Sequence, residues 1–163
     1  MNKICHLRKC FSQILLYLSE YIYLWQQVQC MTTHGTSQKD IQRNRERCRK
    51  IIELSPKIRY VGVINKFGRT LTGQIRNGVT PLLQPDEVRN ECFIEATRFY
   101  LRKNFESSIG KTESTLTINE KVGTLTLANR GNFYYITIEK DTKEMDVEKI
   151  IKSVKALLNN LND

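Results

Sequence analysis

Apolar side chains recur along residues 40–54 at the spacing of a helix that buries one side. The residues on that side are Ile41, Cys48, Ile51 and Ile52. Ser37 and Asp40 resemble a capping signal at the start of this helix. Pro56 ends it, because proline disfavours helical geometry in the residue before it. The pattern therefore predicts a helix whose remaining surface is largely basic.

The period changes to that of β-strands in five later segments. These are residues 58–64, 70–76, 113–119, 122–128 and 133–139. Short turns join the strands within the first pair and within the last three, so each group pairs antiparallel. Strands 58–64 and 133–139 are apolar on both faces, which predicts central positions with helices on both sides. Strands 113–119 and 122–128 alternate threonine with aliphatic residues, which predicts half-covered strands towards an edge.

Two further helices complete the pattern. Residues 85–108 begin with Pro85 and two acidic residues and stop at Gly110, while residues 143–161 carry one broad apolar stripe. The element order is helix, two strands, helix, three strands, helix. We therefore predict an α+β domain over residues 39–163, with a five-stranded antiparallel sheet and helices on both faces.

Two segments carry a resemblance to known families. Residues 60–69, Tyr-Val-Gly-Val-Ile-Asn-Lys-Phe-Gly-Arg, and residues 99–106, Phe-Tyr-Leu-Arg-Lys-Asn-Phe-Glu, resemble an uncharacterised family of ammonia-oxidising archaea. The element order, and the pairing of a glycine hairpin with a long central helix, resemble the roadblock/LC7 group of profilin-like folds. That resemblance implies a sheet order of 2-1-5-4-3. It also implies a dimeric scaffold or a regulator of small GTPases, although fold is a poor guide to function.

The helix over residues 85–108 has two apolar stripes. The wider one is expected to pack on the sheet and contains Val88, Cys92, Phe93, Ala96, Phe99 and Tyr100. The narrower one consists of Ile94, Leu101 and Phe105. We expect it to meet a second subunit, as this helix does in roadblock-like dimers. The alternative is that residues 79–83 or the N-terminal segment cover it.

Two further residues are candidates for the same protein interface. Arg98 lies between the two stripes, and Phe67 lies at a hairpin tip between Lys66 and Arg69. An exposed aromatic ring flanked by cations can anchor a partner. Phe67 could equally fold back on the sheet.

Charge is unevenly distributed along the chain. The formal net charge is +9, and residues 31–57 carry seven basic and three acidic side chains. The later part of the chain is nearly balanced, which argues against a fold dedicated to nucleic acid. Arg43, Arg47 and Lys50 could still contact phosphates or anionic lipid. A solvated helix face is the simpler interpretation.

Candidate catalytic chemistry is sparse. The two histidines, His6 and His34, lie outside the predicted domain, which excludes a Ser-His or Cys-His nucleophile within it. Glu91 and Glu95 share a helix face with Arg98, which favours a solvated salt-bridge ladder over paired catalytic carboxylates. We therefore predict a non-enzymatic domain without a cofactor.

The cysteines and the N-terminal segment are interpreted separately. Cys48 and Cys92 occupy apolar helix positions, and the odd total of five cysteines favours a reducing cytoplasm.

Residues 1–38 are expected to be an extension, either disordered or a weakly amphipathic helix, and translation could begin at Met31. A metal site in this segment fits no zinc spacing well. Its possible ligands are Cys5, Cys10, Cys30 and His34.

The sequence thus predicts a non-enzymatic protein-interaction domain, a homodimeric scaffold or regulator of a small GTPase-type partner. One alternative is a small-molecule sensor of related fold, which would require a pocket with converging polar groups. Another is an accessory that contacts nucleic acid or a membrane through residues 39–57.

Overall fold

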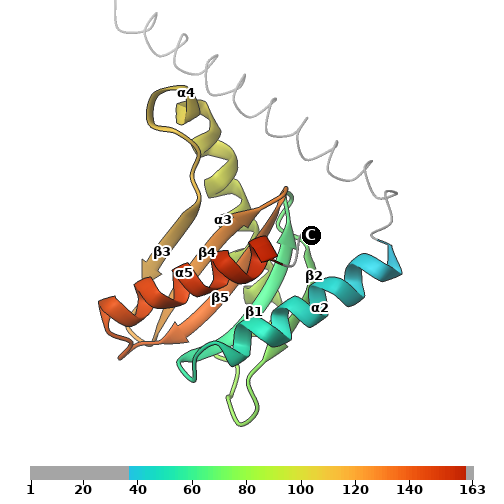
Figure 1. The fold of residues 1–163 in the computed structure, drawn as a ribbon, viewed down its shortest axis with the longest axis vertical. Coiled ribbons are helices and arrows are strands. Elements are labelled where there is room, and N and C mark those ends of the chain that lie inside the picture. Colours follow the sequence, from blue (N-terminus) through green and yellow to red (C-terminus); the bar gives the residue numbers. More distant parts are fainter. Residues whose placement is uncertain (1–36, 161–163) are drawn as a thin grey trace, which may run out of the picture. The chain divides into compact units, whose positions relative to one another are not determined.

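The structure of the protein is a computed structural model that describes residues 37–160. The expectations for an N-terminal helix, a start at Met31 and a metal cluster concern residues outside this range. Residues from Ser37 onward form one compact unit. Figure 1 shows its layers, a twisted sheet with α2 and α5 on one face and α3 on the other.

The first described helix, α2 (Gln38–Glu53), has both ends satisfied by specific groups. The Ser37 hydroxyl accepts a hydrogen bond from the Lys39 amide at 3.3 Å, which confirms the predicted cap. At the other end Arg76 reaches over from beyond β2. Its guanidinium donates to the Ser55 carbonyl at 2.5 Å, and also to the Ile52 carbonyl. These bonds satisfy carbonyls that the end of the helix would otherwise leave without a partner.

Five strands form the sheet, and each lies within about one residue of its predicted range. They are β1 (Ile58–Asn65), β2 (Thr70–Ile75), β3 (Ser114–Ile118), β4 (Val122–Asn129) and β5 (Asn132–Glu139). The spatial order is β2-β1-β5-β4-β3, and all neighbours are antiparallel. The predicted fold class and strand order are therefore confirmed.

The main core lies between the sheet and the pair α2 and α5 (Glu144–Asn160). Side chains from the sheet, α2 and α5 interdigitate there, including Cys48, Ile51, Val61, Val63, Leu125, Leu127, Tyr134, Ile136, Ile150 and Val154. Burying such aliphatic side chains contributes about 1.5–3 kcal/mol each. This face holds most of the apolar burial, so α3 on the opposite face can be covered less completely.

The helical segment on the opposite face is not the single helix predicted for residues 85–108. It consists of α3 (Pro85–Arg102), a 3₁₀ turn η1 (Lys103–Phe105) and the short α4 (Glu106–Ile109). Phe99 is the last buried side chain of this segment. Beyond it the chain projects past the sheet (Figure 1), so no packing holds a regular helix there. Gly110 then ends the segment with a left-handed φ of 81°.

The prediction that β4 is half covered was wrong. Thr124 and Thr126 are buried on the face of the sheet that α3 covers. They are neighbours of Tyr135 across the sheet, and that large ring helps to cover them. β3 is at the sheet edge, as expected.

Candidate functional site

The narrow apolar stripe of α3 is open to solvent. The exposed fractions are 53% for Ile94, 50% for Leu101 and 56% for Phe105. Within residues 37–160 no segment seals these side chains, neither residues 79–83 nor any other. Exposed apolar clusters of this kind mark interaction surfaces. We call these three residues the α3 stripe.

The stripe predicted to pack on the sheet is buried over fewer residues than expected. Cys92, Ala96 and Phe99 are buried against the sheet, but Phe93 is 50% exposed and Tyr100 is 55% exposed. The β1–β2 turn explains the difference at Phe93. A Cβ atom added at Gly68 would lie 2.5 Å from the Cα atom of Phe93, so backbone occupies the space beside the helix there. The β1–β2 turn therefore packs directly against the backbone of α3 at Phe93.

Glu95 is a buried carboxylate and not part of a solvated ladder. Its side chain is only 2% exposed. It accepts a hydrogen bond from the Thr115 hydroxyl at 3.0 Å, and its other oxygen lies 3.0 Å from Arg98 Nη1. Arg98 also donates to the Thr117 hydroxyl at 2.9 Å. The predicted interface residue Arg98 thus joins α3 to the edge strand β3, and it retains a partly exposed side chain.

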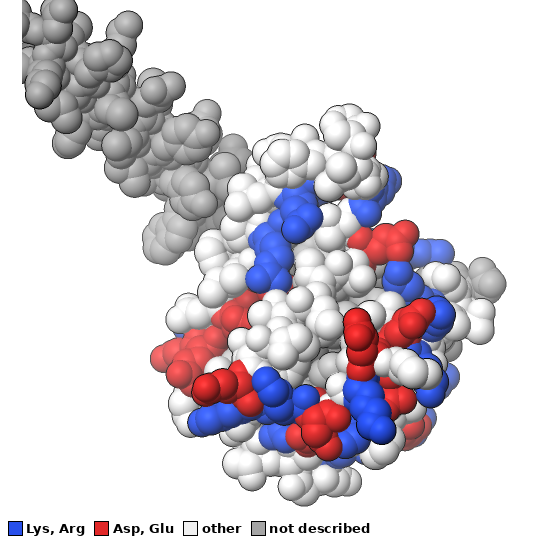
Figure 2. Space-filling view, turned by 90° about the vertical axis from the view of Figure 1, so that its left-hand side faces the viewer, with Lys and Arg blue, Asp and Glu red and all other residues white. Residues whose placement is uncertain are grey.

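The edge strand β3 carries a second exposed apolar pair. Leu116 and Ile118 point to the same sheet face as Leu125, as the alternation predicted, but they are 45% and 60% exposed. Figure 2 views this side of the domain, where a band without charged side chains runs between a column of Lys and Arg and a group of mixed charges. Sequence reasoning missed this pair because alternation gives the direction of a side chain and not how far a covering helix extends.

The hairpin tip fixes Phe67 in a half-buried position. The Asn65 carboxamide oxygen accepts hydrogen bonds from the Phe67 amide at 2.9 Å and the Arg69 amide at 3.0 Å. The ammonium of Lys66 lies 5.0 Å from the centre of the Phe67 ring. Phe67 therefore neither stands free of the turn nor folds fully onto the sheet.

The candidate anion-contacting residues of α2 are mostly engaged within the chain. Arg43 lies 3.5 Å from Asp40, and Lys50 lies 4.0 Å from Glu46. Arg47 is partly buried and donates to the Tyr134 hydroxyl at 3.5 Å. Exposed pairs of this kind contribute little to stability. They do reduce the free positive charge of the helix.

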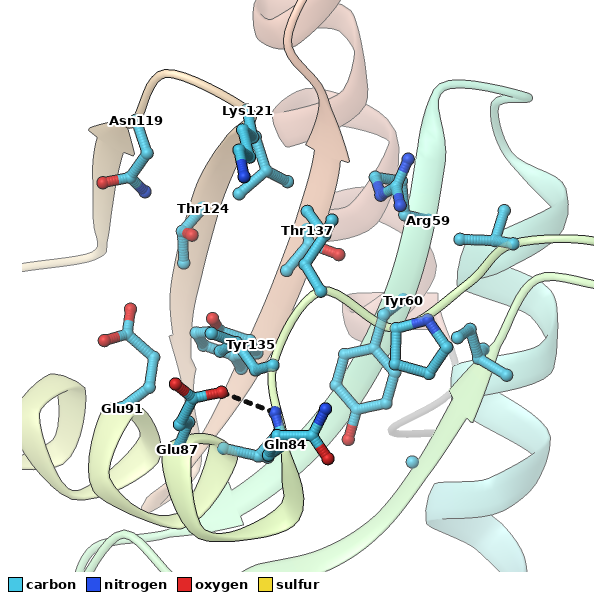
Figure 3. A pocket seen from close by; sticks show the side chains of 18 of the residues that line it. Arg59, Tyr60, Gln84, Glu87, Glu91, Asn119, Lys121, Thr124, Tyr135 and Thr137 are labelled. Carbon is cyan, nitrogen blue, oxygen red and sulfur yellow. Dashed lines mark hydrogen bonds between the residues drawn. The ribbon is translucent and has the colours of Figure 1, made fainter.

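Sequence reasoning did not foresee a groove between the sheet and α3. It has a volume of about 1130 Å³ and lies between the N-terminal half of α3, residues 79–85 and the β3–β4 turn. Its floor is the sheet, where Tyr60, Tyr135, Thr124 and Thr137 present their side chains (Figure 3). The signal available in the sequence is the row of threonines on one face of β4, which alternation alone interprets as exposure to solvent.

The groove perturbs the acidity of its side chains. Burial raises the pKa of Tyr60 to about 12, and burial likewise raises the pKa of Tyr135. The pKa of Glu91 is raised by burial and by the nearby Glu95 carboxylate, although the positive charge of Arg98 and a hydrogen bond from Tyr135 act the other way. All three groups therefore favour their protonated forms more than they would in water.

Within residues 37–160, the thiols and the possible metal ligands offer little support for a catalytic or metal site. Cys48 and Cys92 are buried, as predicted, and burial raises the pKa of Cys48 to about 12 and raises that of Cys92. No cluster of three or more His, Cys, Asp or Glu suited to a metal ion occurs in this part of the chain. None of its helices combines the length and apolar character needed to cross a bilayer.

The comparisons with known proteins bear on the fold. No protein-family model and no curated protein sequence matches the chain. Among solved structures, the gliding protein MglB from Thermus thermophilus is 13% identical to this chain, with a TM-score of 0.60. The alignment covers 74% of this chain and 89% of the MglB chain. MglB from Myxococcus xanthus is 11% identical and covers 78% of this chain and 92% of its own, with a TM-score of 0.61.

The domain shares its α+β fold with these two MglB structures. This agrees with the sheet order and with the helices on both faces. A roadblock/LC7 domain from Streptomyces avermitilis also aligns, at 10% identity over 69% of this chain and 95% of its own, with a TM-score of 0.49. At these identities the likeness concerns the fold alone.

Proposed function

We propose that the domain forms a homodimer through α3 and β3 and acts as a non-enzymatic scaffold or regulator of a small GTPase-type partner in the cytoplasm. The observation that carries the proposal is the exposed α3 stripe beside an exposed sheet edge. Both buried thiols favour the protonated form, so neither is suited to act as a nucleophile. An archaeal origin is part of the proposal, and it depends on the resemblance of residues 60–69 and 99–106.

The free energies of burial and of association indicate which surfaces the dimer must use. Ile94, Leu101 and Phe105 are already half buried, so each gains roughly 1 kcal/mol on full burial, or about 6 kcal/mol for two copies. Association costs an estimated 4–15 kcal/mol, so the α3 stripe alone does not hold a stable dimer. Antiparallel pairing of two β3 strands would add backbone hydrogen bonds and bury Leu116 and Ile118. A twofold axis at β3 allows both contacts at once, because each surface then meets its own copy.

The solution mass of the full chain tests the dimer. Leu101→Glu places a charge in the middle of the α3 stripe, and Met145→Glu makes the same kind of change on an exposed residue of α5 as the control. We expect wild type and Met145→Glu to sediment as dimers and Leu101→Glu to sediment as a folded monomer. A wild-type chain that stays monomeric at all concentrations would refute the proposed dimer.

The GTPase partner requires a separate measurement. Purified small GTPases from the same genome, loaded with GDP or a non-hydrolysable GTP analogue, are passed over the immobilised full chain. We expect one GTPase to bind, with a preference for one nucleotide state, and Leu101→Glu to weaken that binding. If none binds in either state, the GTPase part of the proposal fails and the dimer is unaffected.

A further inference from the structure

The floor of the groove carries two aromatic rings, one of which lies on two glycines. Gly62 and Gly73 are paired across β1 and β2. A Cβ atom would lie 2.7 Å from the Tyr60 hydroxyl oxygen at Gly62 and 2.3 Å from it at Gly73. The Tyr60 ring therefore lies over both glycines, and the centre of the Tyr135 ring is 6.3 Å away in an edge-to-face arrangement. Two rings and two hydroxyl groups thus converge on one part of the sheet.

One carboxylate in this groove has no ion-pair partner among residues 37–160. Glu87 is engaged, because it accepts a hydrogen bond from the Gln84 amide at 2.7 Å. Glu91 is half-buried, accepts a hydrogen bond from the Tyr135 hydroxyl and interacts electrostatically with Arg98, but no lysine or arginine of residues 37–160 forms an ion pair with it. Figure 3 shows both acids rising from α3 on the same side of the groove. A cation placed there would find a carboxylate and aromatic rings together.

The positive groups of the groove do not offset this acidic wall. Arg59 lies 2.7 Å from Glu139 and donates to the Thr80 carbonyl at 3.1 Å. Lys121 lines the far rim at the β3–β4 turn, next to Glu120. The α3 side of the groove is therefore acidic, in a chain whose net charge is +9.

The size and rim of the groove indicate the kind of ligand. About 1130 Å³ exceeds the usual 300–1,000 Å³ of a small-molecule pocket. Its rim carries exposed aliphatic side chains, Leu82 and Leu83 on the loop and Ile94 on α3. A groove of this volume with an acidic wall and an aliphatic rim suits an extended peptide better than a compact metabolite.

We propose that this groove binds an extended segment of a partner protein, with a lysine or arginine side chain directed past the rings of Tyr60 and Tyr135 to Glu91. The aliphatic neighbours of that side chain lie on Leu82, Leu83 and Ile94. This site is separate from the dimer surface except at Ile94, and it needs no second copy of the chain.

Amide NMR spectra of the full chain test this site with the peptide acetyl-Leu-Lys-Leu-Leu-amide. Matched peptides carry norleucine or glutamate in place of lysine, and n-butylammonium chloride represents a free amine. We expect the lysine peptide to shift the amides of Tyr60, Thr124 and Leu82 at millimolar concentration. The norleucine peptide should bind about tenfold more weakly, the difference expected for one charge-assisted contact. The glutamate peptide should bind more weakly still.

Three variants make the result specific. Glu91→Gln should remove the preference for lysine over norleucine, whereas Glu144→Gln, the same change on an exposed residue of α5, should keep it. Leu82→Ser should weaken all peptides alike. Leu101→Glu should bind the lysine peptide as wild type does, so failure of the dimer and failure of the groove are distinguishable.

Several outcomes would overturn the proposal. They are shifts that map outside the groove, equal affinity for the lysine and norleucine peptides, and no binding by any peptide. Binding of n-butylammonium as tight as that of the lysine peptide would assign the groove to free amines and would also overturn it.

Discussion

Substituting alanine for Gly68 tests how firmly the β1–β2 turn fixes α3. Gly68 has a φ of 75°, a left-handed value that costs an alanine roughly 1–2 kcal/mol. Its Cβ would also lie 2.5 Å from the Cα atom of Phe93 and 2.9 Å from the Cys92 carbonyl oxygen. Carbon atoms in contact need about 3.5–4 Å, so the turn or the helix must move by about 1 Å. Such overpacking typically costs a further 1–3 kcal/mol.

Gly78→Ala is a matched control for this substitution. Gly78 has a nearly identical φ of 80°, but no atom lies within 4 Å of its added Cβ. We therefore expect about 1–2 kcal/mol of destabilisation from Gly78→Ala and about 2–5 kcal/mol from Gly68→Ala. The difference between the two isolates the contact of the turn with the helix backbone.

Urea unfolding of the full chain measures both effects. Far-ultraviolet circular dichroism follows the transition, at one fixed protein concentration because a dimer would make the midpoint concentration-dependent. If the two variants differ by less than about 0.5 kcal/mol, the usual limit of additivity, the turn does not press on α3 and the reasoning is wrong.

Three shorter predictions follow from other contacts. Glu95→Ala should lower the free energy of unfolding by about 2–3 kcal/mol in the same urea assay, because the Thr115 hydroxyl and the Arg98 guanidinium each lose a charged partner. Arg76→Ala should cost about 2–3 kcal/mol through the carbonyls it leaves without a donor, whereas Arg69→Ala, an exposed arginine, should be nearly neutral. Stability should fall as the pH rises from about 9 towards 12, because the unfolded thiol of Cys48 loses its proton before the folded one does. A Cys48→Ala variant should show a shallower fall in alkaline urea titrations, and an unchanged slope would contradict this account.

The architecture was predictable because local and tertiary preferences agree. The Ser37 cap, Pro56 and the β-branched runs each determine one boundary, and these positions depend little on the rest of the molecule. The α3 stripe was also predictable as a helical pattern. Its exposure was not, since exposure depends on whether another segment reaches it.

The groove and the buried acid could not be predicted for a different reason. Whether Glu95 is solvated depends on Thr115 in a strand twenty residues away, and helical spacing says nothing about that strand. A helical wheel places Phe93 in the core because it takes no account of the backbone at Gly68. The groove exists because α3 leaves part of the sheet uncovered, and this offset follows from the packing of the whole domain.

Because the Tyr60 ring lies on Gly62 and Gly73, substitutions at these three positions depend on one another. A methyl group at either glycine would lift the ring off the strands and plug the space above, so the chain would block its own groove. A bulkier residue at position 62 or 73 is therefore expected to keep the groove open only where the tyrosine has been replaced by something smaller. Homologous sequences should therefore change these three positions together, and a designer who wishes to close the groove need alter only one of them.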